Sequence, residues 1–250
     1  NAIKEYKGYN LSVQTFYFNP EKKKSFIKAS ESVLNLAPDA VLLASLFYKE
    51  TINAIERFSS SNIMVSTFNS QVESHFVKSG RVAAKLFDAI IYKGQIVVVH
   101  IDETFENAVH MQQKEKGFRK YFEDKENSEF LITTLNLKNP TIEINFKNFL
   151  NENTNVTGVF VTTSKTYQIA KIIREEKSKN IRIIGYDLID ENKSYLSQGT
   201  IDFLIHQNEM QQTYLGITSI VEHLLFGKDI TEKNLLPINI VNTENAEYYI

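Results

Sequence analysis

The sequence has no cysteine and no tryptophan, and it has only 9 glycines and 4 prolines among 250 residues. Without cysteine there is no disulfide bond, no thiolate metal site and no cysteine nucleophile, which is compatible with the reducing cytoplasm where we expect the protein to be. Because no linker rich in glycine, serine or proline is present, we expect the parts of the chain to be joined by short hinges. Since the apolar runs are far shorter than a bilayer span, we expect no membrane partner.

An excess of charge of either sign is also missing. Lysine and arginine total 28 against 30 aspartates and glutamates, which gives a net charge of −2. Nucleic-acid binding needs an excess of positive charge to neutralise phosphates, so we do not expect these residues alone to bind DNA. Hydrophobic residues make up 42% of the chain. That share supports a substantial core, in one large α/β domain or in two lobes.

Short apolar runs rich in valine, isoleucine and phenylalanine alternate with segments of helical period. This alternation is typical of parallel strands connected by crossover helices. The expected strands are 11–18, 40–44, 63–67, 95–101, 130–135, 158–162, 181–186 and 201–206. The expected helices are 21–36, 50–59, 79–92, 112–124, 142–150, 164–177 and 210–226.

Two sets of four strands favour two doubly wound parallel-sheet lobes over a closed barrel, which is the alternative. Residues 101–107 interrupt the pattern with charged residues, so we place the boundary there. The expected N-terminal lobe is 1–102 with 208–232, and the expected C-terminal lobe is 103–207 with 233–250. Because the first seven residues resemble the end of a helix, we expect the first strand of the N-terminal lobe to lie upstream.

Motifs for nucleotide or hydrolase chemistry are missing. Lys78-Ser79-Gly80 has the residues of a Walker phosphate loop in the wrong order, and the glycines lie too far apart for a dinucleotide fingerprint. A metal cluster could form from His100, Asp102, Glu103 and His110, but strand-end and loop residues of this kind are more often solvated. We therefore expect a binding protein, with no enzymatic activity, no cofactor and no metal.

Five short motifs carry a resemblance to a known family. Residues 181–187 form an expected strand ending in Gly-Tyr-Asp, and residues 201–207 form one ending in Gln207. The other three motifs are Lys78-Ser79-Gly80-Arg81-Val82-Ala83-Ala84, Gln113-Lys114-Glu115-Lys116-Gly117-Phe118 and Leu236-Pro237-Ile238-Asn239-Ile240. Their order and spacing resemble the lactose-repressor (LacI/GalR) family and the related type I periplasmic sugar-binding proteins, over nearly the whole chain.

The resemblance implies a periplasmic-binding-protein type I fold and a function. It implies the effector-binding domain of a LacI-type transcriptional regulator, in which a small molecule, most often a sugar, closes the two lobes and changes operator affinity. It also implies a homodimer and operator DNA bound through an upstream helix-turn-helix domain. The alternatives are a periplasmic or sensor-kinase sugar-binding domain without DNA binding, and an enzyme built on the same plan.

The same resemblance places ligand contacts at the strand ends. The Asp187 carboxylate can accept hydrogen bonds from two vicinal hydroxyls, and the Gln207 and Asn69 amides can both donate and accept. Each residue has a structural alternative. Asp187 could cap the next helix, Gln207 could bond the hinge backbone, and Asn69 could form a turn.

Two further positions depart from the family pattern. Lys114 stands where relatives place an arginine, and a lysine lacks the planar fork for bidentate recognition; a solvated helix lysine is the alternative. Thr163 stands where relatives place an asparagine, and it could hold a ligand hydroxyl or cap the next helix. The candidates to stack on the apolar face of a sugar are Phe68, Tyr167 and Tyr186.

Overall fold

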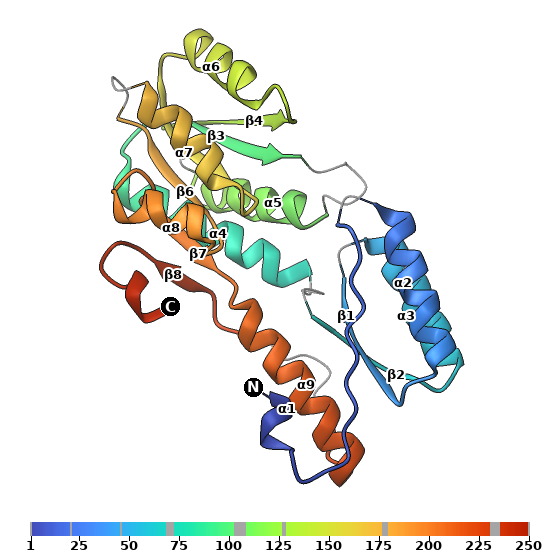
Figure 1. Cartoon of the computed structure of the whole chain (residues 1–250). Helices are drawn as coiled ribbons and strands as arrows, with labels where there is room; N and C mark the ends of the chain where they lie inside the picture. Colours follow the sequence, from blue (N-terminus) through green and yellow to red (C-terminus); the bar gives the residue numbers. More distant parts are fainter. Residues whose placement is uncertain are drawn as a thin grey trace. The chain divides into compact units, whose positions relative to one another are not determined.

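A computed structural model of the chain describes residues 2–20, 22–45, 47–68, 73–102, 109–126, 129–176, 180–230 and 236–249 (Figure 1). The chain forms two compact units. Unit 1 comprises Asn1–Gln71 and Asn208–Leu236, and unit 2 comprises Val72–Gln207 and Pro237–Ile250. The chain therefore passes from one unit to the other at 71–72, 207–208 and 236–237.

Unit 1 is built on two parallel strands, β1 (Ala40–Ala44) and β2 (Met64–Phe68). Its helices are α1 (Ala2–Glu5), α2 (Lys23–Leu36), α3 (Tyr48–Ser60) and α9 (Glu209–Phe226). Phe26, Phe47 and Phe58 are 1% exposed and form the centre of its core. Helix α9 contacts both strands, and Gly216 of α9 lies directly against Leu42 of β1.

Unit 2 contains a six-stranded sheet in the order β4-β3-β5-β6-β7-β8. The strands are β3 (Gly94–Ile101), β4 (Phe130–Leu137), β5 (Val156–Val161), β6 (Arg182–Tyr186), β7 (Phe203–His206) and β8 (Asn239–Val241). All neighbours pair in parallel except β7 and β8, which are antiparallel. This architecture confirms the predicted α/β fold with doubly wound parallel sheets.

Helices cover both faces of this sheet (Figure 1). The helices of unit 2 are α4 (Glu73–Ile90), α5 (Val109–Asp124), α6 (Ile142–Glu152), α7 (Thr166–Glu175) and α8 (Asp190–Ser197), followed by the short 3₁₀ helix η1 (Ala246–Tyr249). On one face of the sheet, Val97 and Val99 of β3 pack with α6 and α7. On the other face, Ile96 and Val98 pack with α4 and α5. A strand buried on both faces is apolar at most of its positions, which explains the apolar run at 96–99 in β3.

The structure corrects the predicted lobe boundary. Strand β3 lies between β4 and β5, so residues 72–102 belong to unit 2 and not to the N-terminal lobe. The sequence pattern identified β3 as a buried strand, but periodicity carries no information about which sheet a strand joins. The charged break at 101–107 follows β3 and is not the passage between the units.

The structure also corrects the expected strand at 11–18, because these residues have no regular secondary structure. The side chains of Val13 and Tyr17 are 56% and 89% exposed. Within the described part of the chain, β1 pairs with β2 and with no other strand. Residues 11–18 therefore have neither a neighbouring strand nor a buried face, the two features that would stabilise a strand here.

Helices α4 and α5 approach each other closely at two glycines. A Cβ atom on Gly80 of α4 would overlap the carbonyl oxygen of Lys114 in α5, and a Cβ atom on Gly117 of α5 would overlap the carbonyl oxygen of Val77 in α4. The two glycines thus bring the two backbones into contact. This contact determines how far Lys114 reaches toward the sheet.

We expect Gly80→Ala to lower the stability of unit 2. Alanine favours a helix over glycine by about 1 kcal/mol, but overpacking against a backbone carbonyl costs about 1–3 kcal/mol or more, so the clash should dominate. The measurement is thermal unfolding followed by circular dichroism. Gly8→Ala is the control, because a Cβ atom there has no neighbour within 4 Å. Equal melting temperatures for the two variants would contradict the close packing.

Candidate functional site

The candidate site lies at the carboxyl ends of β6 and β7, which are neighbours in the sheet. Asp187 follows β6 and Gln207 follows β7, and both are half-buried. The Gln207 Nε2 donates to the Asp187 Oδ1 over 3.3 Å. The structure therefore brings this predicted pair together, at the edge of a parallel sheet where ligands usually bind.

The backbone at Asp187 has an unusual conformation. Its φ angle is 65°, in the left-handed region that aspartate and asparagine tolerate better than other residues with a side chain. The Asp187 N–H donates to the Ile205 carbonyl over 3.0 Å, which continues the pairing of β6 with β7. An aspartate at this position thus suits both the turn and the polar edge of the sheet.

Asn192, on α8, is a site residue that the sequence reasoning missed. Its side chain is 0% exposed. The Oδ1 accepts from the Tyr167 N–H over 2.8 Å, and the Nδ2 donates to the carbonyls of Ser164, Tyr186 and Asp187 over 2.8–3.0 Å. One buried amide therefore holds the start of α7 to the end of β6. The sequence alone gives no signal that distinguishes this asparagine from a solvated one.

Lys114, on α5, is buried, which excludes the solvated alternative. Only 2% of its surface is exposed, and its Nζ donates to the Thr162 carbonyl over 3.0 Å. The same Nζ lies 3.5 Å from the centre of the Tyr186 ring, a cation–π contact. Lys114 thus connects α5 to the ends of β5 and β6.

Tyr186 does not present its ring for stacking, contrary to the sequence prediction. The side chain is 0% exposed, and Lys114 occupies the space next to one ring face. The hydroxyls of Tyr186 and Ser79 form a hydrogen bond of 2.9 Å. Burial raises the pKa of Tyr186 far above its usual range, so the phenol stays neutral.

The remaining predicted site residues are placed as follows. Thr163 is 7% exposed, and its Oγ1 accepts from the Lys165 N–H over 3.3 Å, so it stabilises the turn before α7. Tyr167 is half-buried in the first turn of α7. Phe68 ends β2, but its side chain is outside the described part of the structure, as is the whole of Asn69.

A polar network at the ends of β3 and β4 lies beside Lys114. The Glu115 carboxylate contacts the His100 Nε2 and the Arg119 Nε, each over 2.7 Å, and it also accepts from the Thr134 hydroxyl. The His100 Nδ1 is 2.7 Å from the Thr162 Oγ1. Burial alone would raise the pKa of Glu115, but hydrogen bonds from His100, Thr134 and Arg119 lower it to about 2.

The metal cluster considered from the sequence comprised His100, Asp102, Glu103 and His110. Asp102 bonds to Asn139 and Lys165, Glu103 lies outside the described residues, and His100 is held by Glu115 and Thr162. Among the residues that the structure describes, no three histidine, aspartate or glutamate side chains are arranged to hold a metal ion.

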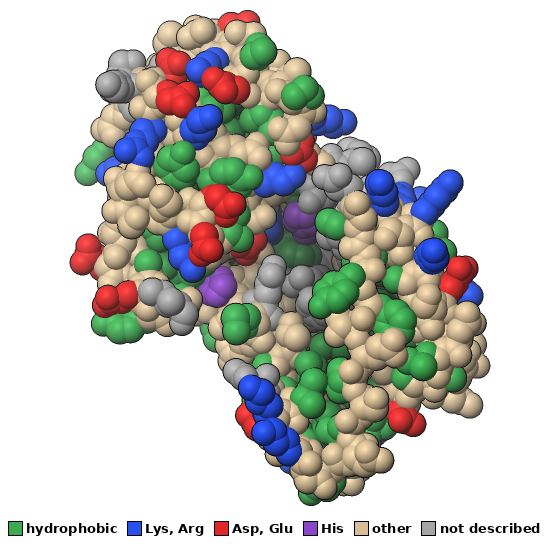
Figure 2. All heavy atoms as spheres, viewed as in Figure 1, with side chains coloured by type: hydrophobic (Ala, Val, Ile, Leu, Met, Phe, Trp, Pro, Cys, Tyr) green, Lys and Arg blue, Asp and Glu red, His purple; other side chains and the backbone are tan. Residues whose placement is uncertain are grey.

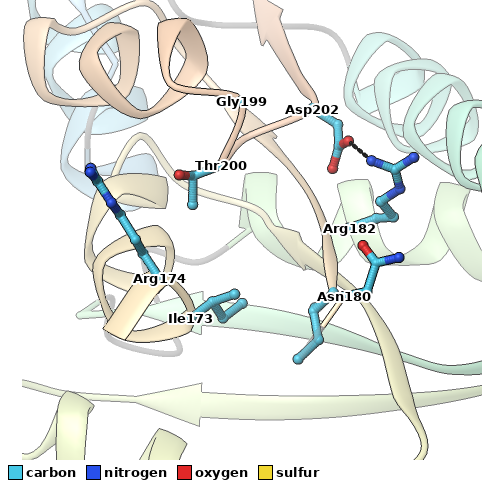
Figure 3. A pocket seen from close by; sticks show the side chains of 8 residues that line it. Ile173, Arg174, Asn180, Arg182, Gly199, Thr200 and Asp202 are labelled. Atoms are coloured by element: carbon cyan, nitrogen blue, oxygen red, sulfur yellow. Dashed lines mark hydrogen bonds and ion pairs between the residues drawn. The ribbon is translucent and has the colours of Figure 1, made fainter. Parts of the chain in front are cut away.

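A shallow hollow of about 250 Å³ lies at the opposite, amino-terminal ends of β6 and β7 (Figure 3). Arg174, Asn180, Arg182, Thr200 and Asp202 are among the residues that line it. Arg182 donates to the Asp202 carboxylate over 2.7 Å (Figure 3). Asp202 also accepts from the Ile183 N–H, so its hydrogen bonds support the start of β6. None of the sequence-predicted site residues lines this hollow.

The surface charges of unit 2 are mixed. Figure 2 shows lysine, arginine, aspartate and glutamate side chains interspersed on the visible face of this unit, without an extended basic patch. Ion pairs on the surface of unit 2 include Lys147 with Glu143 and Lys193 with Asp190. None of the helices in the described ranges combines the length and the apolar character needed to cross a bilayer.

Comparison with known proteins identifies the family. A family model described as a periplasmic binding protein domain matches residues 1–229. The chain belongs to the periplasmic binding protein domain family. No curated protein matches this periplasmic binding protein domain.

Solved structures resemble this periplasmic binding protein domain over most of its length. A candidate LacI transcriptional regulator from Bacteroides fragilis is 25% identical with a TM-score of 0.89, and the match covers 100% of this chain and 91% of that one. A glucose-galactose binding protein from Geobacillus stearothermophilus is 16% identical with a TM-score of 0.75, over 90% and 83% of the two chains. A periplasmic solute binding protein of an ABC transporter from Actinobacillus succinogenes, with bound D-allose, is 18% identical with a TM-score of 0.77, over 99% and 92%.

The low pKa of Glu115 predicts how the stability of this periplasmic binding protein domain changes in acid. A carboxyl group whose pKa falls from 4.5 to about 2 on folding stabilises the protein above pH 4.5, and this contribution disappears as the pH falls toward 2. The shift corresponds to about 3 kcal/mol. We expect Glu115→Gln to lose most of this stability at pH 7 and to show a shallower decline between pH 5 and pH 2, measured by urea unfolding.

Glu143→Gln is the control for that experiment. Glu143 pairs with Lys147 on the surface of α6, and its side chain is 51% exposed. A surface pair of this kind contributes little to stability, so the control curve should follow that of the unaltered chain. Identical acid profiles for the Glu115 and Glu143 variants would contradict the assigned network.

Proposed function

We propose that the chain binds a small hydroxyl-rich molecule, a monosaccharide or a short saccharide derivative, at the carboxyl ends of β6 and β7. The observation that carries this proposal is the contact between the Asp187 carboxylate and the Gln207 amide on neighbouring strand ends. A carboxylate accepts hydrogen bonds from two hydroxyls, and an amide both donates and accepts. Similar structures include a glucose-galactose binding protein and solute binding proteins with bound D-allose or D-arabinose, which supports a sugar ligand here.

We expect Asp187→Asn to abolish or strongly weaken sugar binding. Asparagine keeps the shape of the side chain and tolerates the left-handed backbone, so the fold should survive. Loss of the charge removes charge-assisted hydrogen bonds and should weaken affinity at least about tenfold. The measurement is isothermal titration calorimetry with D-glucose, D-galactose, D-allose and D-arabinose.

Asp190→Asn is the matched control for this variant. The Asp190 side chain is 96% exposed and lies three residues away, at the start of α8. It should bind sugar like the unaltered chain. Full affinity in the Asp187 variant would remove this carboxylate from the site.

We further propose that the domain is the effector-binding part of a LacI-type regulator in the cytoplasm. The similarity to the candidate regulator from Bacteroides fragilis supports this function, because it extends over all of this chain at 25% identity. In this proposal a homodimer binds operator DNA through an upstream helix-turn-helix domain, because a palindromic operator needs two half-site readers. The sugar changes operator affinity by binding one arrangement of the two units more tightly than the other.

The second candidate function is that of a sugar-binding protein that delivers its ligand to a transporter or a sensor kinase. The similarity to the glucose-galactose binding protein and to the solute binding protein of an ABC transporter favours it. Both functions use the same sugar site. They differ in whether the full-length protein binds DNA.

We expect the full-length protein to retard DNA from the control region of its own gene in a gel mobility assay. A sugar that binds the domain should change this retardation, because the ligand and the operator favour different arrangements of the units. The control is a shuffled DNA fragment of equal length. Recovery of the full-length protein outside the cytoplasmic membrane, with no effect on DNA mobility, would instead favour the transporter or sensor function.

A further inference from the structure

We propose that the open edge of strand β4 is a pairing surface for a second copy of this chain, and that Arg119 keeps this surface closed. Strand β4 lies at one edge of the six-stranded sheet of unit 2, and among the described strands it pairs with β3 alone (Figure 1). The free edge of a strand presents unpaired backbone groups, which form a template for another strand. This inference goes beyond the proposed sugar function and does not depend on it.

The hydrogen bonds of β4 show which of its residues face the open edge. The Glu129 carbonyl accepts from the Gly94 N–H over 3.1 Å, and the Leu137 carbonyl accepts from the Asp102 N–H over 2.9 Å. In a parallel ladder, every second residue of a strand points to the same side. The odd-numbered residues of β4 therefore face β3. The N–H and C=O groups of residues 130, 132, 134 and 136 point to the open edge.

Arg119, on α5, reaches this edge. Its Nε donates to the Glu115 carboxylate over 2.7 Å, and its Nη2 donates to the Thr134 hydroxyl over 2.8 Å. Its Nη1 donates to the outward-facing carbonyl of Ile132 over 3.1 Å. A neighbouring strand would need the same carbonyl as an acceptor. The guanidinium thus lies where the N–H group of a pairing strand would have to lie.

The charge of Arg119 makes this contact an effective block. Glu115, which is 16% exposed, holds the guanidinium through an ion pair on the same helix. A pairing strand would have to displace Arg119 from the Ile132 carbonyl or bury it in the new interface. Burying a charged group without enough partners is costly, and natural sheets use inward-pointing charges of this kind to prevent edge-to-edge pairing.

The residues of β4 fit a second copy of the same strand. Residues 130–137 include no charged residue and no proline, so two such strands would not repel each other. In an antiparallel pair centred on Thr133, the outward-facing residues 130 and 132 lie opposite residues 136 and 134 of the second copy. Leu131, which is 56% exposed, then lies opposite Leu135 of the second copy. A twofold axis therefore matches both the hydrogen-bonding groups and the apolar side chains.

We expect Arg119→Met to open the edge. Methionine keeps a long, unbranched side chain but cannot donate to the Ile132 carbonyl. Sedimentation velocity should show a species of about twice the mass of the unaltered one, in a share that rises with protein concentration. Hydrogen exchange measured by NMR should show a Thr134 amide that exchanges quickly in the unaltered chain and at least about tenfold more slowly in the associated variant.

Lys120→Met is the matched control. Lys120 follows Arg119 on α5, its side chain is 57% exposed, and it pairs with Asp124. The variant removes one positive charge from the same helix and leaves Arg119 in place. It should sediment like the unaltered chain, with a Thr134 amide that exchanges equally fast.

A second substitution separates edge pairing from a loss of stability. Arg119→Met also removes a partner of Glu115, so partial unfolding could by itself cause association. Asn136→Pro removes an outward-facing N–H group, at a position where an edge strand tolerates proline. The double variant Arg119→Met/Asn136→Pro lacks the same contact to Glu115, yet it should not associate. Circular dichroism checks that both variants are folded.

Three results would overturn the pairing surface. They are an Arg119→Met variant that sediments like the unaltered chain, association that persists in the double variant, and association that leaves the Thr134 amide unprotected. A Thr134 amide that already exchanges slowly in the unaltered chain would also overturn the proposal, because the edge would then be covered despite Arg119. This last measurement needs no variant. A dimer formed through another surface leaves the Thr134 amide fast, so the test does not depend on the proposed regulator.

Discussion

The buried amide of Asn192 is the interaction on which the candidate site depends most. Where parallel strands end inside a protein, their last carbonyl groups lose their partners in the sheet, and each unpaired buried group costs about 1–3 kcal/mol. Asn192 donates to three carbonyls, those of Ser164, Tyr186 and Asp187, and accepts from the Tyr167 N–H. Asn192 thus holds the backbone of Asp187, whose carboxylate accepts a hydrogen bond from the Gln207 amide.

Lys114 applies a second constraint from the other face of the sheet. Gly80 and Gly117 bring the backbones of α4 and α5 into contact, and the resulting position of α5 places the Lys114 ammonium between the Thr162 carbonyl and the Tyr186 ring. A buried ammonium is tolerated only where a carbonyl and an aromatic face replace part of its hydration. Lys114, which the sequence suggested as a ligand contact, thus connects α5 to the ends of β5 and β6.

The sequence predicted the features that depend on local patterns. The apolar runs predicted β3 to β7, and the strand ends predicted the neighbouring positions of Asp187 and Gln207, because neighbouring parallel strands bring their carboxyl ends to one edge. Features that depend on tertiary partners were missed. The alternation of apolar and polar residues at 11–18 predicted a strand, but no described strand pairs with these residues. The helical period around Lys114 gave no indication that this side chain is buried. Asn192 was missed because an inward-facing asparagine has the same local signature as a solvated one.

The site proposed in unit 2 would account for sugar binding but not for regulation. A ligand held by one unit alone has the same affinity in every arrangement of the two units, and such a ligand shifts no equilibrium between them. A sugar that changes operator affinity therefore needs contacts with residues of unit 1 in only one arrangement. Phe68 ends β2 in unit 1 and Asn69 follows it directly, and both were expected from the sequence to contact the ligand. In the proposed regulator, Asp187 and Gln207 supply affinity, and the energetic coupling to DNA has to come from positions such as these in unit 1.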